Sequence, residues 1–181
     1  MIRLLRRLPA GAAANPPAST LTLPFELRRR SRLLVKLDSG EEGGLFLERG
    51  IVLADGDLLE ADDGRVVRMV AAPEAIYRVT PGPDCPLLRA AYHLGNRHVP
   101  VELGAGSLLL ERDAVLRDML EGLGATVVED TAPFQPEPGA YGGGHRHGDA
   151  AEHDEEYGLA QAVYAFRHGR PAAGGGARGE S

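Results

Sequence analysis

The order of predicted elements in the second half of the chain constrains the fold more than any other feature of the sequence. β-Branched and aliphatic runs predict four strands, and two longer segments have the spacing of helices. The strands are expected at 76–80, 99–103, 107–112 and 125–130, and the helices at 85–95 and 114–123. The resulting series is β, α, β, β, α, β, which is the order of a split βαβ, or ferredoxin-like, domain.

The ends of both helices are marked in the sequence. Asp84 and Asp113 precede them as N-cap residues, whose carboxylates accept hydrogen bonds from free N–H groups of the first turn. Gly95-Asn96 is expected to form a left-handed stop for the first helix, and Gly124 ends the second. Each helix has one apolar face, formed by Leu87, Leu88, Ala91 and Leu94 in the first and by Leu116, Met119, Leu120 and Leu123 in the second.

Residues 1–73 predict a small unit made of β-strands. Short apolar runs alternate with turn residues, and Asp55-Gly56 and Asp63-Gly64 are strong signals for tight turns. Strands are expected within 1–8, 20–23 and 33–37, and then in the runs LFLERG, IVLADGD, LLEADDGR and VVRMVAA. The aspartates here fall in turns, where Asp is favoured for backbone reasons, so they do not predict a catalytic constellation.

The basic run RRRSR at residues 28–32 has two interpretations. Charged side chains at the start of a strand blunt edge pairing, which favours a solvated strand edge. Contact with an anionic partner is the other interpretation.

Together these patterns predict an α+β protein in three parts. An N-terminal small all-β domain (1–73) is followed by a ferredoxin-like βαββαβ domain (74–132) and a flexible, His-containing C-terminal tail (133–181). After Thr131 the composition changes to Pro and Gly, and the final PAAGGGARGES has the low complexity of a disordered segment.

Composition narrows the classes of function. The formal charge of −6 argues against a general nucleic-acid binder, which needs a basic footprint for phosphates. Cys85 is the only cysteine, so neither an intrachain disulfide nor a Cys-based zinc site is expected within one chain. The N-terminus lacks an apolar core of signal-peptide length, and no run approaches membrane-spanning length. We therefore expect a cytoplasmic protein with no membrane contact.

His98 lies where the first helix gives way to a strand, in the segment YHLGNRHVPVEL at residues 92–103. A side chain at such a change of direction is unshielded by its own element and free to bind. One histidine cannot hold a transition-metal ion alone, but two copies related by a two-fold axis can bring two imidazoles together. The alternative is an ordinary surface histidine at the start of a strand.

Three further histidines follow in the tail, interleaved with acidic residues: His145, His147 and His153. They have two interpretations, as accessory metal ligands or as part of a solvated polar tail. His93 and His168 are weaker candidates, His93 because its position on the helix points it elsewhere and His168 because it is isolated.

Three stretches carry a resemblance to a known family. The segment YHLGNRHVPVEL, together with LERGIVLADGDLLEADDG and the tail AYGGGHRHGDAAEHDEEYG, resembles the urease accessory protein E family (UreE). Proteins of that family are nickel metallochaperones that help load urease. The similarity runs over about residues 20–157 and implies a β domain followed by a ferredoxin-like domain that dimerises.

The resemblance implies a homodimer that carries Ni²⁺ and has no catalytic turnover of its own. His98 and its symmetry mate would be the principal ligands, with His145, His147 and His153 closing over the ion from the tail. Zn²⁺ or Cu²⁺ could take the place of Ni²⁺. The expected partners are the urease accessory GTPase and the urease maturation complex.

One departure from the family pattern bears on the ligand set. Many relatives carry additional histidines at the start of the second helix, where this chain has ERDAVLRDML. Glu111 or Asp113 could offer oxygen donors there, although Asp113 is explained more simply as a helix cap. Two rival functions remain: an enzyme using the aspartates of the β domain, and a chaperone-like, peptide-binding module with incidental metal affinity.

Overall fold

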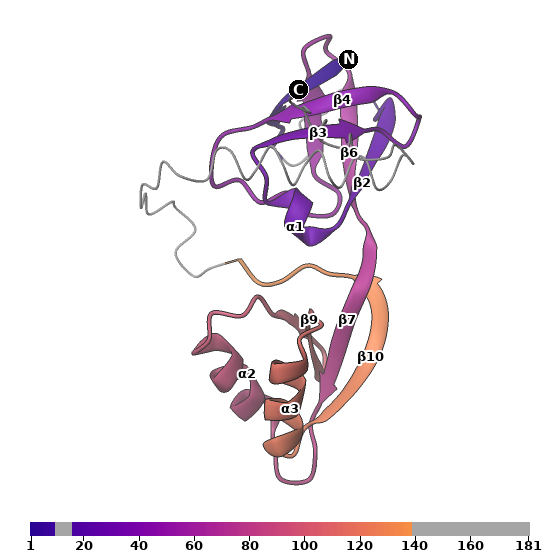
Figure 1. Cartoon of the computed structure of the whole chain (residues 1–181). Helices are drawn as coiled ribbons and strands as arrows, with labels where there is room; N and C mark the ends of the chain where they lie inside the picture. Colours follow the sequence, from indigo (N-terminus) through magenta and orange to yellow (C-terminus); the bar gives the residue numbers. More distant parts are fainter. Residues whose placement is uncertain (10–15, 139–181) are drawn as a thin grey trace, which may run out of the picture.

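The computed structural model describes residues 1–9 and 16–138, which form two units, each built on its own β-sheet. Figure 1 shows the first unit above the second, with β7 (Pro73–Thr80) leading from the first into the second and β10 (Thr126–Pro133) running back beside it. The chain is therefore mixed α+β, with more strand than helix. No helix in the described ranges has the length and apolar character needed to cross a bilayer.

The first unit is a six-stranded sheet in the order β2-β6-β5-β1-β4-β3. Its strands are β1 (Ile2–Arg7), β2 (Ser19–Leu23), β3 (Arg32–Lys36), β4 (Glu42–Phe46), β5 (Leu58–Ala61) and β6 (Val66–Ala71). Alternate residues of these strands point inward, so Leu4, Leu21, Leu59 and Met69 are fully buried in one core.

Three details of this unit differ from the sequence prediction. The strand expected in the run LFLERG is β4, which ends at Phe46, so residues 47–50 form no strand. A helical turn, α1 (Phe25–Arg28), interrupts the expected all-β order after Pro24. The run IVLADGD forms no strand, although Leu53 within it is fully buried. Its backbone bonds instead to α1, because the N–H of Leu53 donates to the carbonyl of Arg28 (3.0 Å).

The Asp-Gly turns are confirmed, and their carboxylates serve the backbone. Gly56 and Gly64 both have positive φ, at 83° and 82°. The carboxylate of Asp55 accepts from the N–H of Ala71 (2.8 Å). These contacts are the backbone role that turn aspartates usually have.

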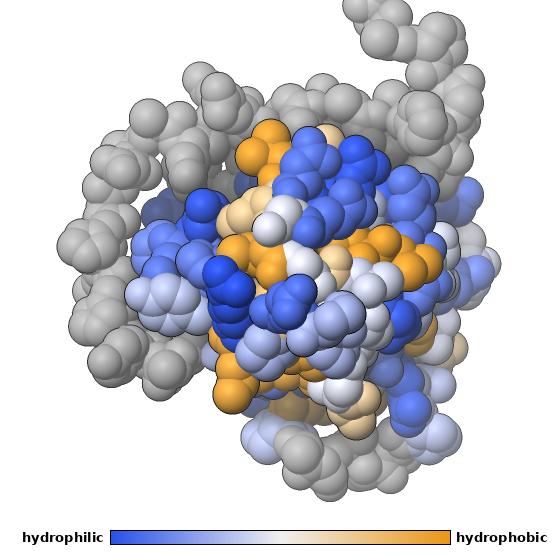
Figure 2. Space-filling model, turned by 90° about the horizontal axis from the view of Figure 1, so that it is seen from below, coloured by the Kyte–Doolittle hydropathy of each residue, from blue (hydrophilic) through white to orange (hydrophobic). Residues whose placement is uncertain are grey.

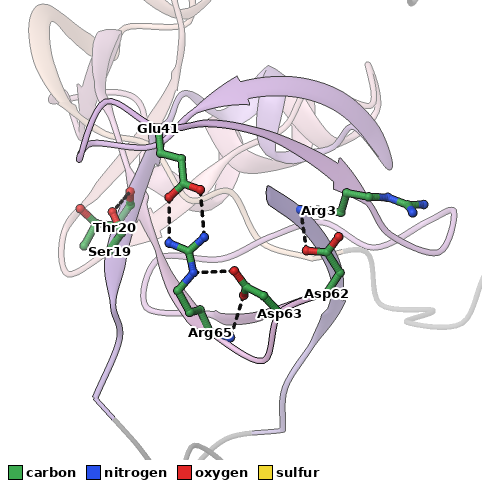
Figure 3. A network of polar contacts seen from close by, with 7 residues as sticks. All are labelled: Arg3, Ser19, Thr20, Glu41, Asp62, Asp63 and Arg65. Atoms are coloured by element: carbon green, nitrogen blue, oxygen red, sulfur yellow. Dashed lines mark hydrogen bonds and ion pairs between the residues drawn. The ribbon is translucent and has the colours of Figure 1, made fainter. Parts of the chain in front are cut away.

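The turn at 62–65 adds an ion-pair network to these backbone contacts (Figure 3). Asp62 accepts from the N–H of Arg3 (3.1 Å), while the Arg65 guanidinium bridges Asp63 (2.7 Å) and Glu41 (2.8 and 2.9 Å). The backbone N–H and guanidinium of Arg65 lower the pKa of Asp63. These carboxylates therefore stabilise a turn through Arg65 and the backbone.

The second unit follows the predicted order of elements. After β7 come α2 (Leu87–Gly95), β8 (Glu102–Gly104), β9 (Ser107–Glu111), α3 (Ala114–Gly122) and β10. The sheet order is β10-β7-β9-β8 with all neighbours antiparallel, and both helices lie on the same side of it (Figure 1). The core between helices and sheet contains Val79, Ala90, Leu94, Leu110 and Leu120.

The two helices start differently. Asp113 caps α3 as predicted, since its carboxylate accepts from the N–H groups of Val115 (2.8 Å) and Leu116 (3.0 Å). The prediction that Asp84 caps the first helix is wrong. The N-cap of α2 is Pro86, which makes no side-chain cap bond, and Asp84 lies in the preceding turn between Gly82 and Cys85. Pro86 instead contributes a pre-set φ of −63°.

The basic run at 28–32 is only partly solvated. Arg32 is exposed at the start of β3, as a strand-edge residue should be. Arg28 is only 1% exposed, so the solvated interpretation is wrong for this residue. Its place at the end of α1 turns the side chain inward, towards the boundary between the two units.

Candidate metal-binding site

His98 closes the C-terminal end of α2 in a left-handed backbone conformation. Its φ is 55°, and no other non-glycine residue in the described ranges has positive φ. The N–H of Val99 donates to the carbonyl of Leu94 (3.2 Å), and that of His98 donates to the carbonyl of Gly95 (3.0 Å). This pair of bonds is the Schellman motif, in which His98 holds the position usually given to glycine.

The predicted stop at Gly95-Asn96 is therefore placed two residues too early. Asn96 has φ −64°, so the right-handed turn continues through it. Leu94 and Val99 pack in the same core, which is the apolar contact that accompanies this motif. Fixed between these contacts, His98 is held exposed at the surface. A left-handed histidine is uncommon, and such outliers concentrate at functional sites.

Two residues of the preceding turn lie close to His98 in the chain. The ring of His93 is half-buried and packs edge-on against Tyr92, with centroids 5.5 Å apart. The Arg97 guanidinium donates to the carbonyl of His93 (3.0 Å). The ring and the carbonyl of His93 therefore each have a contact within α2 and its C-terminal turn.

A second apolar stripe on α2 faces outward. Ala90 and Leu94 are buried, whereas Leu88 is 84% exposed and Tyr92 65% exposed, one helical turn apart. The sequence prediction that Leu88 lies on the buried face of this helix is therefore wrong. The buried face is the one marked by the i, i+3, i+7 spacing of Leu87, Ala90 and Leu94. Figure 2 views the molecule from below, on the side of the second unit, and shows apolar patches between hydrophilic side chains.

The residues after β10 pass close to the segment that leads from His98 into β8. The N–H of Glu137 donates to the carbonyl of Val101 (2.9 Å), three residues beyond the histidine. His145, His147 and His153 lie outside the described residues, as does His168. Within residues 1–9 and 16–138, no group of three or more His, Cys, Asp or Glu residues is arranged to hold a metal ion.

Comparison with known proteins identifies the chain. Residues 2–72 match the family described as UreE urease accessory protein, N-terminal domain, and residues 74–161 match the corresponding C-terminal domain. The chain belongs to the UreE family. The second match extends across the segment that contains the tail histidines.

Curated relatives agree with this assignment. The chain is 55% identical over 163 residues to a urease accessory protein UreE of Burkholderia lata, a match that covers 90% of this chain and 78% of the relative. Identity to the UreE of Burkholderia thailandensis is 60% over 153 residues, covering 84% and 72% of the two chains. The UreE of Paraburkholderia xenovorans is 59% identical over 152 residues, covering 84% and 68%. Membership of this family of urease accessory proteins implies a role in urease maturation.

The two acidic candidates of this UreE chain lie in different surroundings from His98. Asp113 is committed to capping α3. Glu111 ends β9, and burial raises the pKa of its carboxyl, with further increases from Glu26 and Glu74. Its electrostatic neighbours therefore belong to the boundary with the first unit.

Proposed function

We propose that this UreE chain is a homodimeric nickel metallochaperone, which delivers Ni²⁺ for assembly of the urease metallocentre without catalytic turnover of its own. The observation that carries the proposal is His98, which is exposed and locked in a left-handed conformation at the end of α2. Membership of an accessory-protein family supports the same role.

The chemistry of the donors suits a carried ion. Imidazole is a good ligand for Ni²⁺, and it also accepts Zn²⁺ and Cu²⁺. We assign His98 and the same residue of a second copy as principal ligands, and His145, His147 and His153 as accessory donors. A site shared between two subunits and a tail can be opened again, which a carrier needs in order to release its cargo.

The exposed stripe of α2 supports dimerisation beside His98. An isologous interface places the same surface of each copy face to face, so Leu88 and Tyr92 would bury each other and bring both α2 ends to the symmetry axis. Leu88→Glu should then shift sedimentation towards the monomer. Val115→Glu is the matched control, because Val115 is 77% exposed on α3.

We assign the remaining parts of the chain as follows. Residues 1–73 make protein contacts, residues 74–132 form a ferredoxin-like domain for dimerisation and metal binding, and residues 133–181 form the tail. The proposed partners are the urease accessory GTPase and the urease maturation complex, in the cytoplasm.

Nickel titration by calorimetry tests the proposal. His98→Asn keeps a side chain that tolerates the left-handed conformation but removes the imidazole, so the tight phase should disappear. His93→Ala is the matched control and should retain that phase. A chain truncated after residue 138 should lose only part of the stoichiometry. The truncation has to spare Phe134, which is fully buried. An unchanged tight phase in His98→Asn would refute the ligand assignment.

One surface of the first unit favours the alternative function, a peptide-binding module with incidental metal affinity. The ring of Phe46 lies between the guanidinium groups of Arg3 and Arg32, whose Cζ atoms are 4.7 and 5.4 Å from its centroid. Leu34 is 44% exposed on the same outer face of the sheet. Such a surface suits an acidic peptide. Under this alternative, urease-complex binding would persist in chelator and in His98→Asn, but would fall in Arg32→Glu.

A further inference from the structure

A buried arginine joins the first unit to the segment that follows β10. The Arg28 guanidinium donates to the carbonyl of Leu53 (2.8 Å) in the first unit and to the carbonyl of Phe134 just beyond β10. Its side chain lies 1% exposed, and its pKa is lowered by burial. A buried guanidinium is costly unless its donors are satisfied. The two carbonyls satisfy its terminal nitrogens, while its Nε has no hydrogen-bond partner among the described residues.

Phe134 fills the space beside this arginine. It is fully buried in a small cluster with Phe25 of α1 and with Ile76 and Leu109 of the second sheet. The Phe25 and Phe134 rings meet edge to face, with centroids 5.4 Å apart and planes at 77°. The cluster therefore contains residues of both units and of the chain that leaves β10.

The next residues continue this bridge by hydrogen bonds. The side chain of Gln135 accepts from the N–H of Asp55 (2.7 Å) in the first unit. Its own N–H donates to the carboxylate of Glu102 (2.6 Å) in the second unit. The N–H of Glu137 then donates to the carbonyl of Val101 (2.9 Å). A segment without regular secondary structure is thus tied to both units at successive residues.

We propose that residues 134–137 form an inter-unit clasp locked by Arg28, and that this clasp fixes the point from which the C-terminal tail departs, beside Val101 in the segment that leads from His98 into β8. Arg28 is then a positioning residue for the tail donors, a consequence that rests on the proposed nickel function. Holding Glu137 at Val101, three residues beyond His98 in the chain, raises the effective concentration of every donor on the tail that follows.

Hydrogen exchange measured by mass spectrometry tests the clasp without metal. In Arg28→Met, which keeps the apolar stem and removes the donors, amides in the peptide covering 134–138 should exchange at least about tenfold faster. Arg32→Met is the matched control, an exposed arginine on β3, and should leave that peptide unchanged. If Arg28→Met does not fold, Gln135→Ala removes the bond to Asp55 alone and should give a smaller acceleration of the same peptide.

Nickel calorimetry on the same full-length variants tests the positioning role. Arg28→Met should keep the tight phase that His98→Asn abolishes, but weaken the tail-dependent phase about three- to tenfold. Unchanged exchange at 134–138 in both Arg28→Met and Gln135→Ala would overturn the clasp. Faster exchange with an unchanged tail-dependent phase, or a full-length titration equal to that of the chain ending at 138, would overturn the positioning role. Intact tight nickel binding in His98→Asn would overturn the proposed function instead. The clasp would then still be tested by the hydrogen-exchange result alone.

Discussion

The two helices of the second unit end in the same hydrogen-bonded motif but place different residues in its left-handed position. In α3, the N–H of Ala125 donates to the carbonyl of Leu120 (3.0 Å) and that of Gly124 donates to the carbonyl of Glu121 (2.9 Å). The corresponding bonds in α2 are made by Val99 and His98. Gly124 has φ 93° and His98 has φ 55°. One helix ends on the residue that adopts this conformation without strain, and the other ends on a histidine.

The surroundings of the two ends explain the difference. The end of α3 is packed against the turn before α2, so closely that a Cβ on Gly82 would lie 1.7 Å from the carbonyl oxygen of Gly124. The end of α2 is open, and a Cβ on Gly95 would meet no atom within 4 Å. The closely packed end of α3 requires a small residue at position 82. The open end of α2 has room for the imidazole of His98. The backbone strain of a left-handed histidine there is consistent with selection for a function other than stability.

The largest effect on stability is expected from Gly82→Ala, which places a methyl group at the closely packed end of α3. Its new methyl group would overlap the Gly124 carbonyl, so the turn or the helix end must move. We expect a loss of at least about 3 kcal/mol in the free energy of unfolding, at the upper end of overpacking costs. Urea denaturation measures it, with Gly95→Ala at the open end as the matched control. Equal losses for both variants would contradict the distinction between the two ends.

Gly124→Ala isolates the backbone contribution to the same end. An added Cβ there would make only ordinary contacts with Asp84 (3.6 Å) and Cys85 (3.8 Å), so the cost comes from the positive φ. We expect a loss of about 1–2 kcal/mol by chemical denaturation. His98→Ala should cost clearly less, because the wild-type residue already bears that strain. A larger loss for His98→Ala would show that the imidazole contributes to stability.

Asp113→Ala extends the comparison to the helix starts. Removing the cap leaves the N–H groups of Val115 and Leu116 without their acceptor, which should cost about 1 kcal/mol. Asp84→Ala should have little effect, since Asp84 does not cap α2. Thermal unfolding of the two variants measures the difference. Similar shifts for both would mean that the loop aspartate supports α2 in some other way.

The smallest effect on stability is expected from His98→Gly. Relief of the left-handed strain is partly offset by the greater freedom of glycine in the unfolded chain, so the net gain should be between zero and about 1 kcal/mol. His98→Val should instead destabilise, because a β-branched residue resists positive φ. Denaturant titration of both variants, beside nickel calorimetry, separates backbone strain from ligand loss. A destabilised His98→Gly would remove the argument that function maintains the strain.

Local patterns predicted much of this architecture. The order of elements after residue 73, the Asp-Gly turns, the cap at Asp113 and the end of α3 at Gly124 were each predicted from a few neighbouring residues, and the structure confirms them. The interactions behind these features are short in sequence, so the sequence alone reveals them. His98 was singled out for the same reason, but its role as a metal ligand stays a prediction, as do those of the tail histidines.

The features that the sequence did not reveal depend on distant partners. Arg28 looked like one charge in a solvated run, yet it is buried against a carbonyl 106 residues away. Leu88 had the spacing of a core residue, but the sheet occupies the adjoining face of α2 and leaves it exposed. Sequence determined most of the elements, since propensity and periodicity are local. Tertiary structure decided the exceptions, α1 and the irregular run IVLADGD, and decided which side chains the elements expose, since burial depends on what packs against them.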